Sequence, residues 1–314
     1  MQPPAAVTRL TTELDGGVAR YGPAVLRLGA GLLWLSNVSW KVPPEFGRIG
    51  DGCRGLCAYV NAGGEFPVFP GSAWFFREIV SPNLGAFGWF TLVSEALLAA
   101  LLLSGRYLRV AGWLGLVTSI GIMASVANAE HEWYWSYLLM ALLHLAVILT
   151  AESAPRPSAR TVGGWVAAYG VVTVVANSQR GFAGGAGDWV LFGARNDFPG
   201  DFGRNVFPGS IALGAIFVVL GLAAVFSDRI AESARSAVGW ALVGCAALML
   251  VTYGADGTLL GLGSRATSAA VVAALGLAVA VPAERSGPNS HGGHGGPVGH
   301  NEGSAPPDTA DAIA

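Results

Sequence analysis

The segment at residues 84–104, LGAFGWFTLVSEALLAALLLS, constrains the fold more than any other part of the sequence. About twenty apolar residues in a row match a membrane-crossing helix, because the hydrocarbon core is about 30 Å thick and a helix rises about 1.5 Å per residue. Glu95 stands near the middle, where a carboxylate costs roughly 2.5–3.5 kcal/mol on insertion scales. We therefore expect another group in the protein to pair with Glu95 or to protonate it.

The composition agrees with a membrane protein. Hydrophobic residues make up 53% of the chain and charged residues 12%, and the mean hydropathy is +0.52. Soluble domains carry about twice that share of charged residues. The net charge of −2 provides no basic surface for nucleic acid. We predict an all-α integral membrane protein whose partner is the lipid bilayer, with no nucleic-acid partner.

Apolar segments of similar length recur along the chain and predict eight transmembrane helices. They lie at residues 21–41, 84–104, 107–128, 133–151, 162–179, 209–227, 236–255 and 265–282. Among the short loops, those on the side of the termini carry most of the arginines: Arg106, Arg109, Arg156, Arg160, Arg229 and Arg235, against Arg265 on the other side. The positive-inside rule then places both termini in the cytoplasm, so that the chain is a multi-pass protein of the cytoplasmic (inner) membrane. The two long loops, 42–83 and 180–208, follow helices 1 and 5 and face outward.

An internal repeat divides the chain into two halves. VFPGS occurs at residues 68–72 and again at 206–210, and Asn37 and Asn177 end similar apolar segments upstream. A shared order and offset indicate a tandem duplication, in which an even number of helices per unit gives a parallel repeat. Only the first unit contains an acid like Glu95, so the second unit is the degenerate copy. The expected parts are a cytoplasmic segment at 1–20, bundles at 21–152 and 162–283, a linker at 153–161, and a disordered His/Gly-rich cytoplasmic tail at 284–314.

Glu95 and His144 each lie near the middle of a predicted helix of the first bundle. Glu95 has three interpretations: a buried acid paired with Arg27 that fixes helix packing, a proton-handling group beside a bound substrate, or an idle acid that is protonated or faces lipid. His144, in the fourth segment, is a hydrogen-bonded packing residue, a partner of a substrate carbonyl or proton relay, or a haem ligand. A second intramembrane histidine is missing from the sequence, which disfavours a bis-His haem site. We expect no haem.

Charged and aromatic residues gather at the predicted outer ends of the helices. They are Lys41, Trp74, Arg77, Glu132 and Trp133. One interpretation is an interfacial aromatic belt with solvated charges. The other is a binding site for a small anion between the two cations and the aromatic walls.

Cys53 and Cys57 lie in the outer loop, where disulfides persist. Their spacing differs from a thioredoxin-type CxxC, and two sulfurs do not make a zinc site. They form a structural disulfide or a redox-active pair. Cys245 is expected to be a small buried residue within its helix.

His291, His294 and His300 in the tail belong to a solvated spacer or bind a soft metal. No dinucleotide fingerprint or Walker loop occurs, and we expect neither flavin nor a metal centre.

Three stretches of the first half together resemble the DoxX family. They are LRLGAGLLWLSNVSWK, then GSAWFFREIVSPNLGAFGWFTLVSEALLAALLLSGRYLRVAGWLG, then HEWYWSYLLMALLHLAVIL. The resemblance covers roughly residues 22–152 and is nearest to the DoxD-like branch, the small subunit of thiosulfate:quinone oxidoreductase. It rests on Arg27, Lys41, Glu95, Arg109 and the Glu132–Trp133 pair.

The resemblance implies a DoxX-like four-helix bundle and a role in moving electrons from a thiosulfate-like compound to the membrane quinone pool. Quinone would be the electron acceptor, with Glu95 as the proton-handling group beside it and His144 as a partner of its carbonyl. A partner redox subunit or a larger respiratory complex is also expected. Under this interpretation thiosulfate is the anion at the outer site. Two other functions stay open. One is a non-catalytic membrane subunit that anchors a redox complex, and the other is a small-anion transporter.

Overall fold

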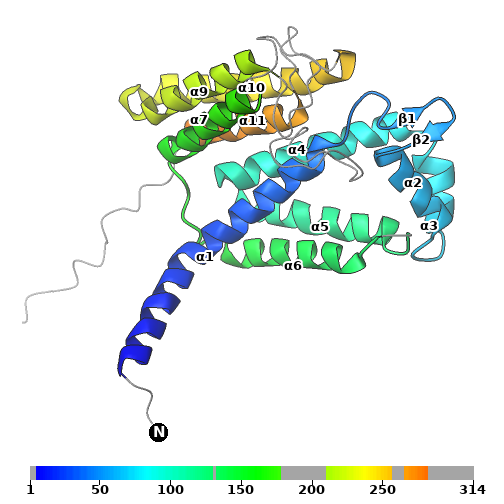
Figure 1. Cartoon of the computed structure of the whole chain (residues 1–314), viewed down its shortest axis with the longest axis horizontal. Helices are drawn as coiled ribbons and strands as arrows, with labels where there is room; N and C mark the ends of the chain where they lie inside the picture. Colours follow the sequence, from blue (N-terminus) through cyan, green and yellow to red (C-terminus); the bar gives the residue numbers. More distant parts are fainter. Residues whose placement is uncertain (1–4, 130–131, 178–209, 257–264, 282–314) are drawn as a thin grey trace, which may run out of the picture. The chain divides into compact units, whose positions relative to one another are not determined.

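The computed structural model describes residues 5–129, 132–177, 210–256 and 265–281 (Figure 1). Most of these residues are helical. The outer loop 180–208, the second VFPGS apart from Ser210, and the tail at 284–314 with its three histidines lie outside the described residues. The predictions made for those segments stay predictions.

A helix lies at each of the eight predicted positions. They are α1 (Ala5–Ser39), α4 (Leu84–Ser104), α5 (Leu108–Val126), α6 (Tyr134–Thr150), α7 (Ala159–Ala176), α9 (Ile211–Val225), α10 (Glu232–Asp256) and α11 (Ala266–Ala280). By length and composition α4, α5 and α10 can each cross a membrane, and α6, α7, α9 and α11 are shorter apolar helices. A largely helical membrane protein is therefore confirmed.

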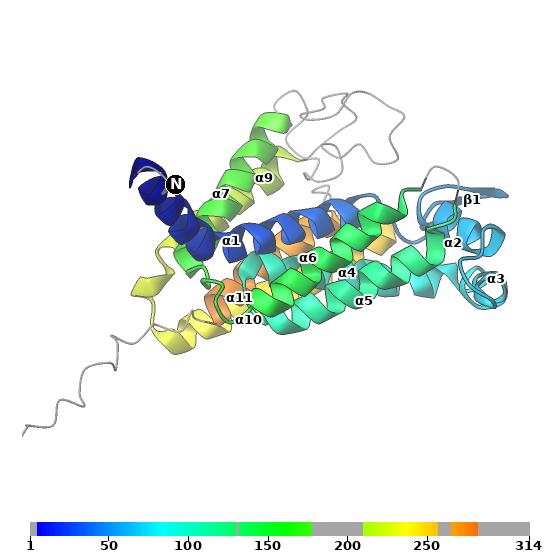
Figure 2. The same cartoon turned by 90° about the horizontal axis from the view of Figure 1, so that it is seen from below.

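The eight helices just named pack mainly in four pairs, and the two members of each pair follow one another in that series. In the first half α1 packs against α4, and α5 against α6; in the second half α7 packs against α9, and α10 against α11. Figures 1 and 2 both show α5 beside α6 and α7 beside α9. Glycines allow the α7–α9 backbones to approach closely, since a Cβ on Gly221 would stand 2.4 Å from Ala167 N.

Helix α11 is enclosed by other helices. It packs against α10 and α4, and also contacts α7 and α1. Nearly all its residues are buried, and most are Ala, Val or Gly. Small side chains let several helices approach it at once, which is the packing expected when lipid offers no hydrophobic driving force between helices. The helix that connects the two halves thus comes from the half that the sequence marks as degenerate.

The predicted first helix and first outer loop differ from the structure. Helix α1 begins at Ala5 rather than at residue 21, with Pro23 inside it. The segment 42–83 is structured rather than an open loop. It contains β1 (Arg48–Ile49), β2 (Gly52–Cys53), α2 (Leu56–Glu65), α3 (Ser72–Trp74) and the π-helical turn η1 (Phe75–Val80).

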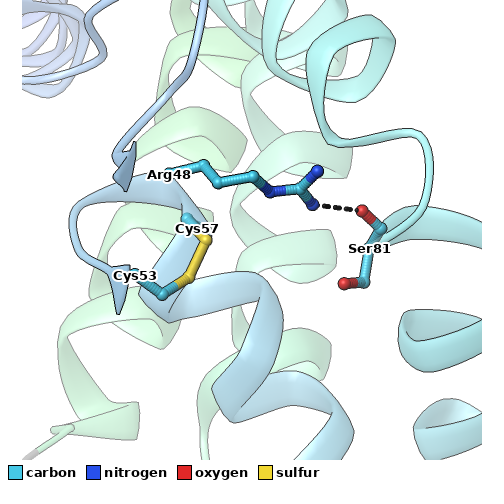
Figure 3. The surroundings of a disulfide bond; sticks show 4 residues. All are labelled: Arg48, Cys53, Cys57 and Ser81. Atoms are coloured by element: carbon cyan, nitrogen blue, oxygen red, sulfur yellow. Dashed lines mark hydrogen bonds between the residues drawn. A yellow bond between two sulfur atoms is a disulfide. The ribbon is translucent and has the colours of Figure 1, made fainter. Parts of the chain in front are cut away.

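This outer segment is held together by covalent and polar contacts. A disulfide joins Cys53 in β2 to Cys57 in the first turn of α2, and Arg48 Nη2 donates to Ser81 O at 2.7 Å (Figure 3). Cys57 N also donates to Phe46 O at 3.0 Å. The hairpin, α2 and the turn between η1 and α4 are thereby fixed to one another beside the end of α1.

Large apolar side chains are exposed along several helices, as expected for surfaces that face lipid. They include Phe90 on α4, Trp113 on α5, Leu149 on α6, Val219 on α9 and Val251 on α10. Cys245 belongs to this surface, because its side chain is exposed on α10. The expectation that Cys245 is buried is wrong. A periodic apolar sequence does not reveal which of its faces meets protein and which meets lipid.

Candidate functional site

A buried ion pair joins α4 to the end of α1. Lys41 Nζ lies 2.7 Å from Glu95 Oε2, and the two side chains are 3% and 1% exposed. Glu95 stands midway along α4, and Lys41 follows the last turn of α1. Because an unpaired charge at this depth is costly, the pair satisfies the requirement that the sequence sets at Glu95.

Asn37 and Trp40 complete the polar cluster. Asn37 Nδ2 donates to Glu95 Oε1 at 3.1 Å, and Trp40 Nε1 donates to Asn37 Oδ1 at 3.2 Å. Lys41 Nζ also donates to Asn37 O at 3.0 Å and lies 3.9 Å from the centroid of the Trp40 ring. Both carboxylate oxygens of Glu95 are thus held from α1, since Asn37 and Lys41 are four residues apart on one helical face.

The cluster faces a cavity of about 560 Å³. Its walls come from the end of α1 and from α2, η1, α4, α5 and α6. Seven aromatic rings besides Trp40 line it: Tyr59, Phe69, Phe75, Phe76, Phe87, Phe90 and Tyr137. On α4 the lining positions 87, 90, 91, 94 and 95 follow the helical repeat, so they share one face. Lys41 and Glu95 are the charged side chains among the described lining residues.

Two residues of the cavity wall also belong to the exposed apolar surface. Phe90 on α4 and Val117 on α5 line the cavity and are 72% and 64% exposed. On helices that cross a membrane such exposed positions face hydrocarbon. The cavity therefore borders the surface of α4 and α5 that would meet lipid.

A second acid lies beside this cavity. Tyr137 Oη donates to Glu132 Oε2 just before the start of α6. Burial, together with the charge of Glu132 and a hydrogen bond to it, raises the pKa of Tyr59 on α2 to about 12. Both tyrosines line the cavity and Glu132 is half-buried. At neutral pH the Tyr59 hydroxyl is therefore protonated and hydrogen-bonded to Glu132.

The expected pairing of Arg27 with Glu95 is wrong. Arg27 Nη1 donates to Leu102 O at 2.7 Å and to Leu103 O at 3.1 Å. These carbonyls belong to the last turn of α4, where the helix macrodipole favours a cation. Leu102 is seven residues beyond Glu95, about 10 Å along a helix. Lys41 takes the place that the sequence analysis gave to Arg27.

His144 is fully buried, and protein groups occupy both of its ring nitrogens. Trp34 Nε1 donates to Nε2 at 2.7 Å, and Nδ1 lies 2.7 Å from Met140 O. The geometry is that of a neutral imidazole protonated on Nδ1. His144 is not among the described residues that line the cavity. Its position corresponds to the packing interpretation, in which it connects α6 to α1.

The residues predicted for an outer anion site are not brought together. Lys41 is buried in the ion pair, and Arg77 on η1 lines a separate small cavity with Glu65. Trp74 and Trp133 are exposed, as expected for an interfacial aromatic belt. Of this set, Lys41 lines the large cavity, and Glu132 reaches it through Tyr137.

The predicted cysteine pair is joined as a disulfide (Figure 3). Cys57 is buried and Cys53 is half-buried, and Leu56, the neighbour of Cys57, lines the cavity. Among the described residues there is no group of three or more His, Cys, Asp or Glu side chains placed to hold a metal ion.

Sequence reasoning missed the roles of Asn37, Tyr59 and Tyr137. A signal for Asn37 was present, because Trp34, Asn37 and Lys41 recur at helical spacing at the end of an apolar segment. Tyr59 lies in a segment interpreted as loop, so no pattern connected it to Glu132. No protein-family model, curated protein or solved structure matches this chain.

Proposed function

We propose that the cavity beside Lys41 and Glu95 binds a membrane quinone, and that the protein transfers electrons to it from a thiosulfate-like sulfur compound. One observation carries the quinone part: an aromatic-lined cavity of about 560 Å³ that borders exposed apolar residues and ends at a buried ion pair. Pockets of 300–1,000 Å³ with a few convergent polar groups are typical ligand sites.

Each part of the cavity suits a part of a quinone. The phenylalanine and tyrosine rings offer faces for stacking on the quinone ring. Lys41 and Asn37 carry N–H donors that suit a quinone carbonyl. The apolar edge at Phe90 and Val117 suits an isoprenoid tail that stays in the bilayer.

Glu95 would handle protons in this reaction. Reduction of a quinone to a quinol takes up two electrons and two protons, so the Glu95 carboxylate would first accept a proton and then deliver it to the ring beside it. Glu132, with Tyr137 and Tyr59, is the second acid at the cavity and lies nearer the outer segment. We propose that protons enter the cavity from the outside through Glu132, so that Glu95 is protonated again after each turnover.

The sulfur donor in this proposal comes from the DoxX-like, DoxD-like resemblance over residues 22–152. The Cys53–Cys57 disulfide lies beside the cavity wall in the outer segment and is a candidate point at which electrons enter. A partner redox subunit is the other candidate donor. At the Cys53–Cys57 disulfide, two thiosulfate ions would reduce the disulfide to two thiols and leave joined as tetrathionate, and the thiols would pass two electrons to the quinone as the disulfide forms again.

The proposal includes the full arrangement in the membrane. Eight helices would cross the cytoplasmic membrane as two tandem four-helix bundles, with both termini in the cytoplasm. The matching packing of the two halves supports this duplication, because α1–α4 and α5–α6 correspond in order to α7–α9 and α10–α11. The α1–α6 contact has a counterpart in α7–α11.

The experiment is thiosulfate-dependent quinone reduction by the purified full chain in lipid nanodiscs, comparing wild type with Glu95→Gln. Loss of a positioned proton donor typically lowers rates by 10²–10⁴-fold, so we expect a decrease of about a hundredfold. Glu152→Gln is the matched control, because Glu152 is an exposed acid paired with Arg109 at 2.6 Å. Its turnover should equal that of the wild type.

Two results would contradict parts of the proposal. Equal turnover in wild type and Glu95→Gln, with both proteins folded, removes Glu95 from the reaction. A folded wild type that binds quinone and reduces none of it, but co-purifies with a soluble redox protein, indicates the anchoring function. Uptake of labelled thiosulfate into sealed vesicles without quinone reduction indicates the transporter.

A further inference from the structure

A second cavity lies between α1, α7 and α11, apart from the ion pair. Its volume is about 320 Å³, and apolar side chains form most of its walls. Leu28 and Leu32 on α1 face Trp165 on α7 and Ala274 on α11 across it. Arg27, Arg156 and Thr161 also line this groove, so it combines a long apolar wall with two guanidinium groups.

Arg27 has no acidic partner among the residues that the structure describes. The residue is 4% exposed, and within this part of the chain its guanidinium donates to the carbonyls of Leu102 and Leu103. Its Nε has no hydrogen-bond partner in the described part of the chain. A buried guanidinium with an unused donor and no carboxylate beside it is costly, and an anion would relieve that cost.

Further positive charge surrounds the same position. Arg106 is buried in the turn between α4 and α5, and it donates to the carbonyls of Ala278 and Val281 at the end of α11. Burial, together with the charges of Arg156 and Arg27, lowers the pKa of Arg106 to about 10. Helix α7 begins at Ala159 beside the groove, and its N-terminus adds partial positive charge. No acidic residue lines the groove in the described part of the chain.

We propose that this groove binds one anionic phospholipid, whose phosphate lies against Arg27 and Arg156 and whose acyl chain lies along Leu28, Leu32 and Trp165. Leu32 and Trp165 are 50% and 47% exposed, so the groove is open to the surrounding bilayer, from which a lipid enters. Basic pockets between transmembrane helices are known to hold lipid head groups. This site is separate from the quinone cavity and does not depend on the proposed function.

The test is native mass spectrometry of the full chain in detergent with added phosphatidylglycerol or phosphatidylcholine. We expect one phosphatidylglycerol to be retained in preference to phosphatidylcholine. Arg156→Gln should lower its apparent affinity about fivefold, since an arginine near an anionic lipid contributes about 1 kcal/mol. The control is Arg109→Gln, an exposed arginine on α5 outside the groove, which should leave the affinity unchanged.

A second variant tests the acyl part of the site without altering charge. Leu32→Trp places a larger side chain in the groove and should also weaken the binding of phosphatidylglycerol. Inorganic phosphate at a concentration on the order of tenfold above that of the lipid should not displace the bound phosphatidylglycerol. Equal retention of both lipids by the wild type overturns the proposal, as does an equal effect of Arg156→Gln and Arg109→Gln. Displacement by inorganic phosphate, with Leu32→Trp unchanged, identifies a free-anion site and also overturns it.

Discussion

At the scale of single residues, the Lys41–Glu95 pair is costly to form and costly to break. Taking both charges out of water costs several kcal/mol per ion, which their attraction offsets only with good geometry and additional hydrogen bonds. Asn37 and Trp40 supply those bonds. A pair of apolar residues would hold α1 against α4 equally well, so a functional use of the charges is the better account of why they are present.

This account predicts a specific pattern of stabilities. Lys41→Met leaves Glu95 buried and unpaired, and it should lower the free energy of unfolding by about 3–5 kcal/mol. The double variant Lys41→Met with Glu95→Leu should recover most of that loss, because no buried charge remains. Reversible unfolding in mixed micelles measures the complete double-mutant cycle. Losses that simply add would show that the two charges do not interact.

At the scale of elements, the contact between α5 and α6 depends on a glycine opposite His144. A Cβ on Gly115 would stand 1.9 Å from His144 Cδ2, and the imidazole is already held by Trp34 and Met140. The ring cannot move away without breaking one of these hydrogen bonds. Small residues set the spacing of these helices, as they do between α7 and α9.

Gly115→Ala should therefore destabilise the protein by about 1–3 kcal/mol, the usual cost of overpacking. The matched control is Gly121→Ala on the same helix, where an added Cβ meets no atom within 4 Å. Thermal unfolding in detergent should show a lower Tm for the Gly115 variant and an unchanged or slightly higher Tm for the control. Equal Tm values in the two variants would contradict the packing described here.

The sequence was a reliable guide to the helices and a poorer guide to their contacts. Apolar length is a property of each segment alone, so helices occur at all eight predicted positions. The partner of Glu95 depends on the depth at which α1 ends beside α4, which no local pattern contains. Segment 42–83 is held in its structure by the disulfide and by contacts of α2 with α4 and α5. These contacts are not visible in the sequence, and the polar composition alone led to the interpretation as a loop.

At the scale of the whole molecule, the proposal fixes which groups lie on each side of the membrane. The α4–α5 turn and the linker before α7 carry arginines and should face the cytoplasm, whereas α2 and the disulfide should face outward. This orientation brings sulfur substrates to the outer segment and places the arginine-lined groove at the cytoplasmic end.

Cysteine labelling tests the orientation directly. In a Cys245→Ser background, Glu65→Cys on α2 should react with a membrane-impermeant maleimide in intact cells, while Arg160→Cys on α7 should react only after lysis. Both positions are exposed, so access to the reagent decides the outcome. The opposite pattern would place the termini outside and contradict the orientation.

The central claim is that the cavity above the ion pair holds the quinone ring, and the most direct test is equilibrium binding of a short-chain quinone to the purified chain. Gly121 lines the cavity and a Cβ there meets no atom within 4 Å, so the side chain of Gly121→Phe begins in open space and its ring should occupy the cavity. We expect saturable binding by wild type and at least about a tenfold loss in Gly121→Phe, equivalent to 1.4 kcal/mol. Gly244→Phe, at an equally open position on α10, is the control and should bind as wild type does. Equal affinity of the Gly121→Phe variant and wild type would contradict the claim.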